Sequence, residues 1–186
     1  MSYKNFLCVL ASAIVMSGCG TQLKVAEVDG KTGLLKSEKG EVATATVVTA
    51  KRVSLKPFKG MVFASGSQFN IDQMKKIGYF DEVLDLDGLQ KLIITEKLQD
   101  KVPSLNDKIG LNNLYRAYKP FLWVYFKRVT QNGKPYVQLV ATNPDTLEDL
   151  FVSEVHIDFA WTGMTDQNSR YPLYNSLITW INQNKD

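Results

Sequence analysis

Residues 121–141 read FLWVYFKRVTQNGKPYVQLVA, and this stretch decides the fold. The six residues from Phe121 to Phe126 are all apolar, which is typical of a strand covered on both faces. The pair Asn132-Gly133 favours a two-residue hairpin turn. The apolar run is therefore expected to pair antiparallel with a second strand over residues 136–141.

The chain after this hairpin predicts a third strand and a closing helix. A turn at residues 143–146 precedes a long strand in which apolar and polar side chains alternate, and Pro172 suits the first turn of a helix. The apolar side of the strand is expected to hold Phe151, Val155, Ile157, Phe159 and Trp161, and the apolar face of the helix Tyr174, Leu177, Ile178 and Ile181. These elements make a three-strand antiparallel meander followed by a C-terminal helix.

Upstream of the hairpin, strands and helices alternate. Residues 61–64 and 79–84 predict strands, because both are short apolar-rich runs between turn residues. Helix starts are expected at Asn70, Asp87 and Ser104, where a capping residue precedes helical apolar spacing. The third helix is expected to carry Ile109, Leu114 and Tyr118, with Gly110 as a weak point. The predicted fold class is α/β (α+β), with a single mixed sheet and helices packed on it.

The N-terminal residues carry the pattern of a secretory signal. Lys4 precedes an apolar stretch from Phe6 to Met16, and these eleven residues are fewer than the ~20 that a membrane-spanning helix needs. The sequence Met16-Ser17-Gly18-Cys19 then resembles the lipobox of bacterial lipoproteins. The resemblance implies cleavage before Cys19 and attachment of acyl chains, palmitate among them, to this residue. The alternative is an ordinary signal peptide with an unmodified Cys19.

Lipidation would determine both the localisation and the cysteine chemistry. Two or three acyl chains would hold the protein firmly on a membrane. Gly20 stands where an inner-membrane retention signal commonly has Asp, so the resemblance to the enterobacterial sorting rule favours the outer membrane, with the protein facing the periplasm. Because Cys8 leaves with the signal and Cys19 becomes a thioether, we expect no disulfide, cysteine nucleophile or zinc thiolate site.

We expect three segments along the chain. They are a signal peptide at residues 1–18, the lipidated Cys19 with a polar tether at residues 19–50, and a single α/β domain at residues 51–186. The β-branched residues from Val42 to Ala50 favour a strand near the end of the tether. The mature chain has 168 residues, enough for a stable core, and a net charge near +2. This charge balance and the expected compartment argue against nucleic-acid binding.

Candidate catalytic chemistry is sparse. His156 is the only histidine, and it alternates with Glu154 and Asp158, so the three side chains are expected on one face of a strand. Two interpretations stay open: a weak metal site or pH-sensitive contact, and an ordinary solvated face. The sequence contains no Gly-x-Ser-x-Gly elbow and no phosphate-binding loop. We therefore expect no enzyme activity, no cofactor and no resident metal.

Two other features suit binding. The run from Phe121 to Phe126 needs cover on its second face, either from the protein's own helices or from a partner. The polar segment 162–171 joins a strand to a helix, and long loops between rigid elements often carry function. The residues expected to contact a partner there are Trp161, Asp166, Arg170 and Tyr171. An ordinary connecting loop is the alternative.

The region from Lys59 to Asn184 resembles the α/β domain shared by the amino-terminal part of TolB, the curli-secretion lipoprotein CsgG and the penicillin-binding-protein activator LpoB. The matching features are the segment from Gly78 to Leu92, the apolar strand at residues 121–126 and the turn at residues 143–146. The Arg that often precedes the helix starting here at Asp87 is absent. The resemblance implies a protein-binding or ring-forming envelope lipoprotein without catalysis, and it does not imply a secretion pore.

The leading functional hypothesis is a noncatalytic outer-membrane lipoprotein whose domain binds an envelope protein or itself, in envelope assembly or maintenance. The alternative is a periplasmic carrier of a lipid or another apolar ligand. The carrier hypothesis is motivated by the aromatic residues Trp123, Tyr125, Phe151, Phe159 and Trp161.

Overall fold

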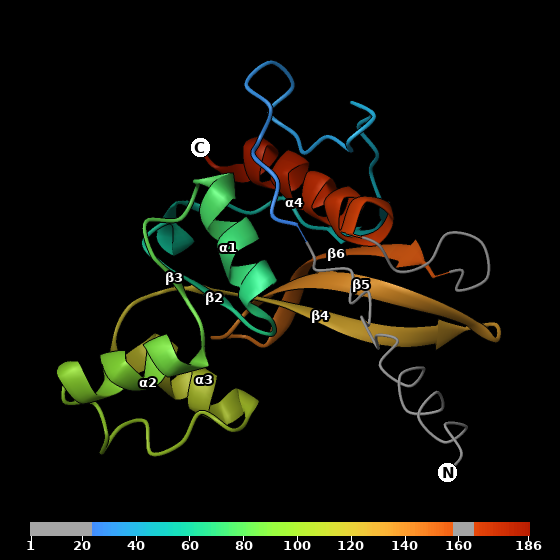
Figure 1. The fold of residues 1–186 in the computed structure, drawn as a ribbon. Coiled ribbons are helices and arrows are strands. Elements are labelled where there is room, and N and C mark those ends of the chain that lie inside the picture. The colour runs from blue at the N-terminus through green and yellow to red at the C-terminus, as the bar shows by residue number, and fades with distance from the viewer. Residues whose placement is uncertain (1–23, 158–165) are drawn as a thin grey trace, which may run out of the picture.

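The computed structural model describes residues 24–157 and 166–186. Its strands are β1 (Thr46–Ala50), β2 (Val62–Ala64), β3 (Val83–Leu84), β4 (Leu122–Gln131), β5 (Lys134–Asn143) and β6 (Glu148–His156). Within the described residues they form one six-stranded sheet in the order β1-β6-β5-β4-β2-β3 (Figure 1). β2 pairs in parallel with β3 and β4, and the remaining neighbours pair antiparallel. The predicted mixed sheet with a C-terminal meander is confirmed.

Helices cover the sheet on both faces. They are α1 (Gln68–Ile77), α2 (Leu86–Thr95), α3 (Lys108–Ala117) and α4 (Tyr171–Asn184), with a 3-10 turn at Lys56–Phe58 and a π-helical turn at Asp166–Arg170. α1 and α4 lie on one face, and α2 and α3 lie on the other (Figure 1). Side chains from successive β4 residues enter two separate cores, because neighbouring residues of a strand point to opposite faces.

The hairpin between β4 and β5 forms as predicted. The last pair before the turn joins Gln131 to Lys134. Asn132 and Gly133 have φ angles of 51° and 75°, the left-handed conformation that a twisted two-residue hairpin turn requires at both positions. The turn predicted at residues 143–146 also forms and connects β5 to β6.

The helix starts differ from the predicted ones. Asn70, Asp87 and Ser104 do not cap the helices, and the N-caps are Ser67, Asp85 and Asp107. The two aspartate caps accept hydrogen bonds from the amide nitrogens of Gly88 and Gly110, at 2.7 and 2.8 Å. Each observed N-cap lies within three residues of the predicted one. The predictions failed because two residues that could cap the helix lie close together at each start. The strand predicted over residues 79–84 shortens to β3.

α4 has the predicted apolar face and a second, polar buried face. Tyr174 and Leu177 are fully buried in the core beneath the helix. Asn175, Ser176 and Asn184 are also buried, although their side chains are polar. Burying a polar side chain is costly unless it is hydrogen-bonded, so these residues need partners inside the protein.

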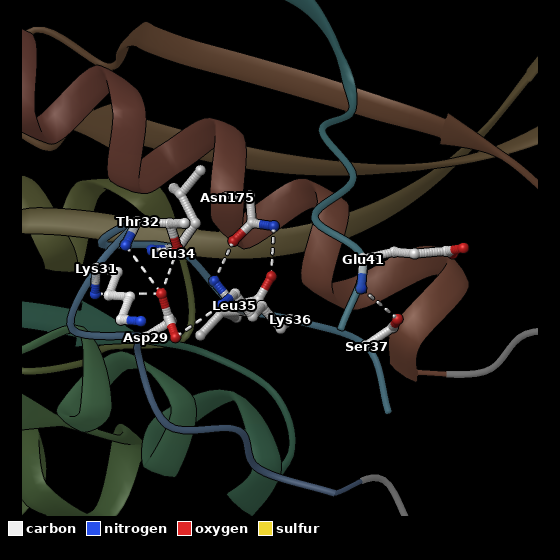
Figure 2. Close-up of polar contacts among 9 residues, drawn as sticks. All are labelled: Asp29, Lys31, Thr32, Leu34, Leu35, Lys36, Ser37, Glu41 and Asn175. Carbon is white, nitrogen blue, oxygen red and sulfur yellow. Dashed lines mark hydrogen bonds and ion pairs between the residues drawn. The ribbon is translucent and has the colours of Figure 1, made fainter. Parts of the chain in front are cut away.

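Asn175 and Ser176 find partners in residues 24–45, which lie against α1 and α4 and which we call the N-terminal strap (Figure 1). Oε1 of Gln73 accepts from Ala26 N, and Nε2 of Gln73 donates to Ala26 O, both at 2.9 Å. The side-chain amide of Asn175 makes the same pair of hydrogen bonds with the backbone of the buried residue Leu35 (Figure 2). Over residues 24–45, α1 and α4 thus supply hydrogen bonds that the composition of this segment does not reveal.

The polar stripe of α4 also binds the last residue of the strap and the chain that follows it. Oγ of Ser176 accepts from Ala45 N at 3.0 Å, and Oδ1 of Asn184 accepts from Val53 N at 3.0 Å. Trp180, midway between them on the helix, donates from Nε1 to the backbone at Lys51 at 2.9 Å. Residues four apart share one face of a helix, so a single stripe fixes the chain on both sides of β1.

Candidate docking surface

α2 and α3 form a small unit with its own core, which we call the α2–α3 unit (residues 86–117). Leu89 and Leu114 are fully buried, and they belong to one cluster with Phe63 and Phe121 from the sheet side. The unit lies at the opposite end of the molecule from the first turn of α4 (Figure 1). Close packing of this core fixes the positions of α2 and α3 relative to each other.

Gly110 brings α3 close to the chain that joins it to α2. A β-carbon at this position would lie 2.0 Å from the carbonyl oxygen of Ser104. No larger residue fits at that distance without moving the backbone. Glycine is unfavourable within a helix, but Gly110 is needed here for the close approach of Ser104.

Two isoleucines of the α2–α3 unit are open to solvent. Ile94 is 64% exposed and Ile109 is 66% exposed. Ile109 lies in the expected third helix, but its side chain faces solvent. α3 begins only at Lys108, and its buried side passes through Gly110, Leu111 and Leu114.

A cavity of about 370 Å³ opens beside Ile94. Ile93 and Val102 contribute apolar lining, and Gln90 and Gln99 contribute side-chain amides. Amides can both donate and accept hydrogen bonds. The cavity therefore suits an apolar side chain that is flanked by polar groups, as in a protein segment.

The protein itself covers most of the aromatic run in β4. Phe121 and Leu122 are fully buried in the two cores, one on each face of the sheet. The ring centroid of Trp123 lies 6.3 Å from that of Phe63 and 4.3 Å from that of Tyr125. Tyr125 is half-buried, and burial raises its pKa. Intramolecular cover thus accounts for this run, and no partner is needed to complete it.

The aromatic residues behind the carrier hypothesis also pack on one another where they are described. Phe151 is fully buried, and its ring stacks on Trp180 with centroids 5.3 Å apart. The chain's own C-terminal helix therefore covers Phe151. Asp158, Phe159 and Trp161 lie outside the described residues.

The four residues predicted to contact a partner lie in different structural environments. Trp161 lies outside the described residues, and Asp166 is the first residue of the π-helical turn. Tyr171 is only 5% exposed, and its hydroxyl donates to Lys24 O at 2.8 Å. Tyr171 thus holds the start of the strap. A role of the four residues in partner binding stays a prediction.

Arg170, the fourth of these residues, packs against the sheet. Its guanidinium carbon lies 4.0 Å from the centroid of the Phe126 ring, a cation–π contact. Burial lowers the pKa of Arg170, and burial also raises the pKa of the neighbouring Tyr174. A guanidinium stays charged under these conditions, so Phe126 provides the attraction that keeps Arg170 folded onto the domain.

The polar face of β6 is occupied by hydrogen bonds within the protein. Oε2 of Glu154 accepts from the side-chain amides of Gln131 and Gln138, at 2.8 and 2.7 Å. The His156 ring meets Tyr136 edge-on, with centroids 5.2 Å apart. Among residues 24–157 and 166–186, no group of three His, Cys, Asp or Glu side chains could hold a metal.

The predicted lipidation site lies outside the described chain but close to it. Cys19 precedes Lys24, the first described residue, by five positions. None of the helices in the described chain combines the length and apolar character needed to cross a bilayer.

Comparison with known proteins finds no matching family model and no matching curated protein. Among solved structures, the LpoB C-terminal domain from Salmonella enterica has 15% identity and a TM-score of 0.35, over 60% of this chain and 85% of that chain. The LpoB C-terminal domain from Escherichia coli has 15% identity and a TM-score of 0.34, over 53% of this chain and 83% of that chain. LpoB is one of the three proteins that the sequence resembles. Both TM-scores lie below 0.5, so we infer function from this chain's own residues.

Proposed function

We propose that the protein is a noncatalytic lipoprotein, anchored through acyl chains on Cys19 in the outer membrane and facing the periplasm. Its α/β domain docks a protein partner of the cell envelope or a second copy of itself. The lipobox-like sequence ending at Cys19 supports the anchor. The observation that carries the docking role is the pair of exposed isoleucines, Ile94 and Ile109, on the α2–α3 unit, where Ile94 borders an open cavity.

The surroundings of Ile94 and Ile109 distinguish them from other exposed apolar residues. A single exposed apolar residue is ordinary on a protein surface. Here two isoleucines stand on a unit that Gly110 and a buried core hold rigid, and one of them borders a cavity. Binding costs less free energy when the contact residues are already ordered. Charged residues around them, including Lys91 and Lys108, would form the polar rim that is typical of protein interfaces.

Site-specific photo-crosslinking in cells tests this proposal. A photoreactive residue is placed at Ile94, at Ile109 and, as a control, at Gln183, which is exposed on α4. We expect a defined crosslinked product from the first two positions and none from the control. A product of twice the mass would identify a second copy as the partner. Absence of a product from both isoleucine positions would contradict docking through the α2–α3 unit.

Charge substitutions provide the matching loss-of-function test. Ile94→Asp and Ile109→Asp should each weaken recovery of the crosslinked partner, because a carboxylate would have to be desolvated at the interface. Both side chains are exposed, so the free energy of unfolding should change by less than about 0.5 kcal/mol. Unchanged recovery with normal folding would argue against these contacts.

The alternative docking surface is the turn before α4, with Trp161, Asp166, Arg170 and Tyr171. A photoreactive residue at Asp166 tests it in the same cells. Crosslinks from this position and none from Ile94 or Ile109 would move the docking surface to the turn before α4. Replacing Asp166 and Arg170 together with Ala should then weaken the same product.

A further inference from the structure

We propose that the anchored domain rests directly on the membrane surface, with the start of the strap and the first turn of α4 toward the lipid and the α2–α3 unit pointing away. The inference rests on the proposed lipidation of Cys19. Its structural basis is the short chain between that residue and Lys24.

The reach of this chain is small compared with the domain. Five residues from Cys19 to Lys24 span at most about 17 Å when fully extended. A domain of this length has a radius of gyration of about 15 Å and is therefore roughly 40 Å across. The anchor can only lie near the strap start, because the chain is too short to pass around the domain.

The strap cannot lengthen this reach without breaking buried contacts. Tyr171 holds the carbonyl oxygen of Lys24, and Gln73 holds both backbone polar groups of Ala26. Farther along, Leu35 is fully buried. Releasing the strap would leave polar groups without partners and expose apolar surface, so the chain is fixed from Lys24 onward.

The direction of the domain follows from where the strap starts. Its first residue contacts Tyr171 in the first turn of α4, and α2 and α3 lie at the other end of the molecule (Figure 1). Holding Lys24 next to the lipid therefore turns Ile94 and Ile109 outward. This is the side from which a partner in the periplasm can approach.

Chain length, and not charge, sets this orientation. The four lysines of residues 24–45 are balanced by four acidic residues, and three ion pairs form: Lys24 with Glu38, Lys36 with Asp29, and Glu27 with Lys76 of α1. A region with matched charges gains little from anionic headgroups. The orientation should therefore be the same on neutral and on anionic membranes.

Energy transfer from two labelled positions tests the orientation. The mature lipidated protein has no free thiol, so Lys39→Cys on the strap and Lys108→Cys on α3 each accept a single fluorophore. Both residues are exposed, and Lys39 follows Glu38, which pairs with Lys24. The full-length lipidated variants are placed in vesicles of neutral phosphatidylcholine, or of phosphatidylcholine with phosphatidylglycerol, that carry an acceptor on a lipid headgroup.

We expect transfer from residue 39 to exceed transfer from residue 108 several-fold in both kinds of vesicle. A linker of about 30 Gly and Ser residues inserted after Gly20 has a root-mean-square length of about 30 Å, so it should remove most of this difference. Equal transfer from both labels without the linker, or stronger transfer from residue 108, would overturn the orientation. A protein that fails to bind vesicles at all would overturn the lipid anchor as well. Missing crosslinks at Ile94 and Ile109 would instead contradict only the docking surface.

Discussion

The side-chain amide of Asn175 forms two hydrogen bonds with the backbone of Leu35 (Figure 2). Oδ1 of Asn175 accepts from Leu35 N at 2.7 Å, and Nδ2 donates to Leu35 O at 3.0 Å. Both residues are fully buried. Buried backbone groups need partners, and here a helix side chain supplies what a neighbouring strand would supply in a sheet. The strap is part of the fold for this reason.

Asn175→Ala should lower the free energy of unfolding by about 2–4 kcal/mol, because several buried polar groups lose their partners at once. Nδ2 also donates to Ala43 O at 2.8 Å, so the loss extends along the strap. Urea denaturation measures the change. Asn182→Ala is the matched control, since Asn182 is exposed on the same helix and should cost less than about 0.5 kcal/mol. Equal effects of the two substitutions would contradict a clamped strap.

Gly110→Ala should destabilise the protein by about 3 kcal/mol, because the new β-carbon would collide with Ser104 O. Helix propensity alone predicts the opposite sign, a gain of about 1 kcal/mol. Thermal unfolding separates the two outcomes. Gly60→Ala serves as the control, since a β-carbon there meets no atom within 4 Å. A stabilised Gly110→Ala variant would show that α3 does not touch its connecting loop.

Ile178→Asp should unfold the domain or destabilise it by several kcal/mol, against a typical total of about 5–15 kcal/mol. Ile178 is 5% exposed in the core beneath α4, so the carboxylate would be buried without a partner. Circular dichroism during heating measures the loss. Wild-type thermal stability would be incompatible with the packing of this helix.

Asp29 should keep its charge well into the acid range. The hydrogen bond from Lys36 lowers the pKa of this carboxylate most, and bonds from the Thr32 backbone and hydroxyl add to the effect (Figure 2). A lowered folded-state pKa means that the stabilisation is complete above the ordinary value of about 3.9 and is lost as the pH falls through the folded value. The turn should therefore be unchanged between pH 5 and 8 and should loosen only below about pH 4.

Carbon-detected NMR of the Asp29 carboxylate measures this titration directly. The Asp29→Asn variant keeps an oxygen that can accept from Thr32 N but loses the ion pair with Lys36. Its turn should show no corresponding acid transition. Titration of wild-type Asp29 at its ordinary value would contradict the hydrogen-bonded turn.

Elements with strong local signals could be predicted from the sequence. Asn132-Gly133 gives the hairpin its turn, and the alternation through Phe151 and Val155 gives β6 its buried side. The position of Ile109 could not be read in the same way. Ser104 and Asp107 both suit an N-cap, and with Asp107 as the cap Ile109 falls in the first turn of α3, where little of the helix precedes it.

The strap could not be predicted, because its hydrogen bonds come from residues far away in the chain, 47 positions in the case of Ala26 and Gln73. Leu35 and Asn175 are 140 residues apart in the chain, and neither carries a local sign of the other. A signal was nevertheless present in α4. Asn175, Ser176 and Asn184 interrupt an otherwise apolar helix, and polar residues inside a buried helix indicate backbone groups that need partners.

Cys19→Ser should abolish lipidation, because the hydroxyl is a poor substitute for the thiol that accepts diacylglycerol. The variant should lose labelling by a fatty-acid probe and should leave the membrane fraction or remain unprocessed. The fold itself should not change, since Cys19 precedes the strap. Unchanged labelling and unchanged fractionation would show that the anchor is not on this residue.

The lipid anchor on Cys19 is tested by mass spectrometry of the N-terminal peptide from the membrane-extracted protein. A lipoprotein anchored at Cys19 predicts a peptide that begins at Cys19 and Gly20 and carries the mass of two or three acyl chains. A peptide that begins elsewhere, or one that contains an unmodified Cys19, would contradict the lipid anchor and the membrane-facing orientation that depends on it.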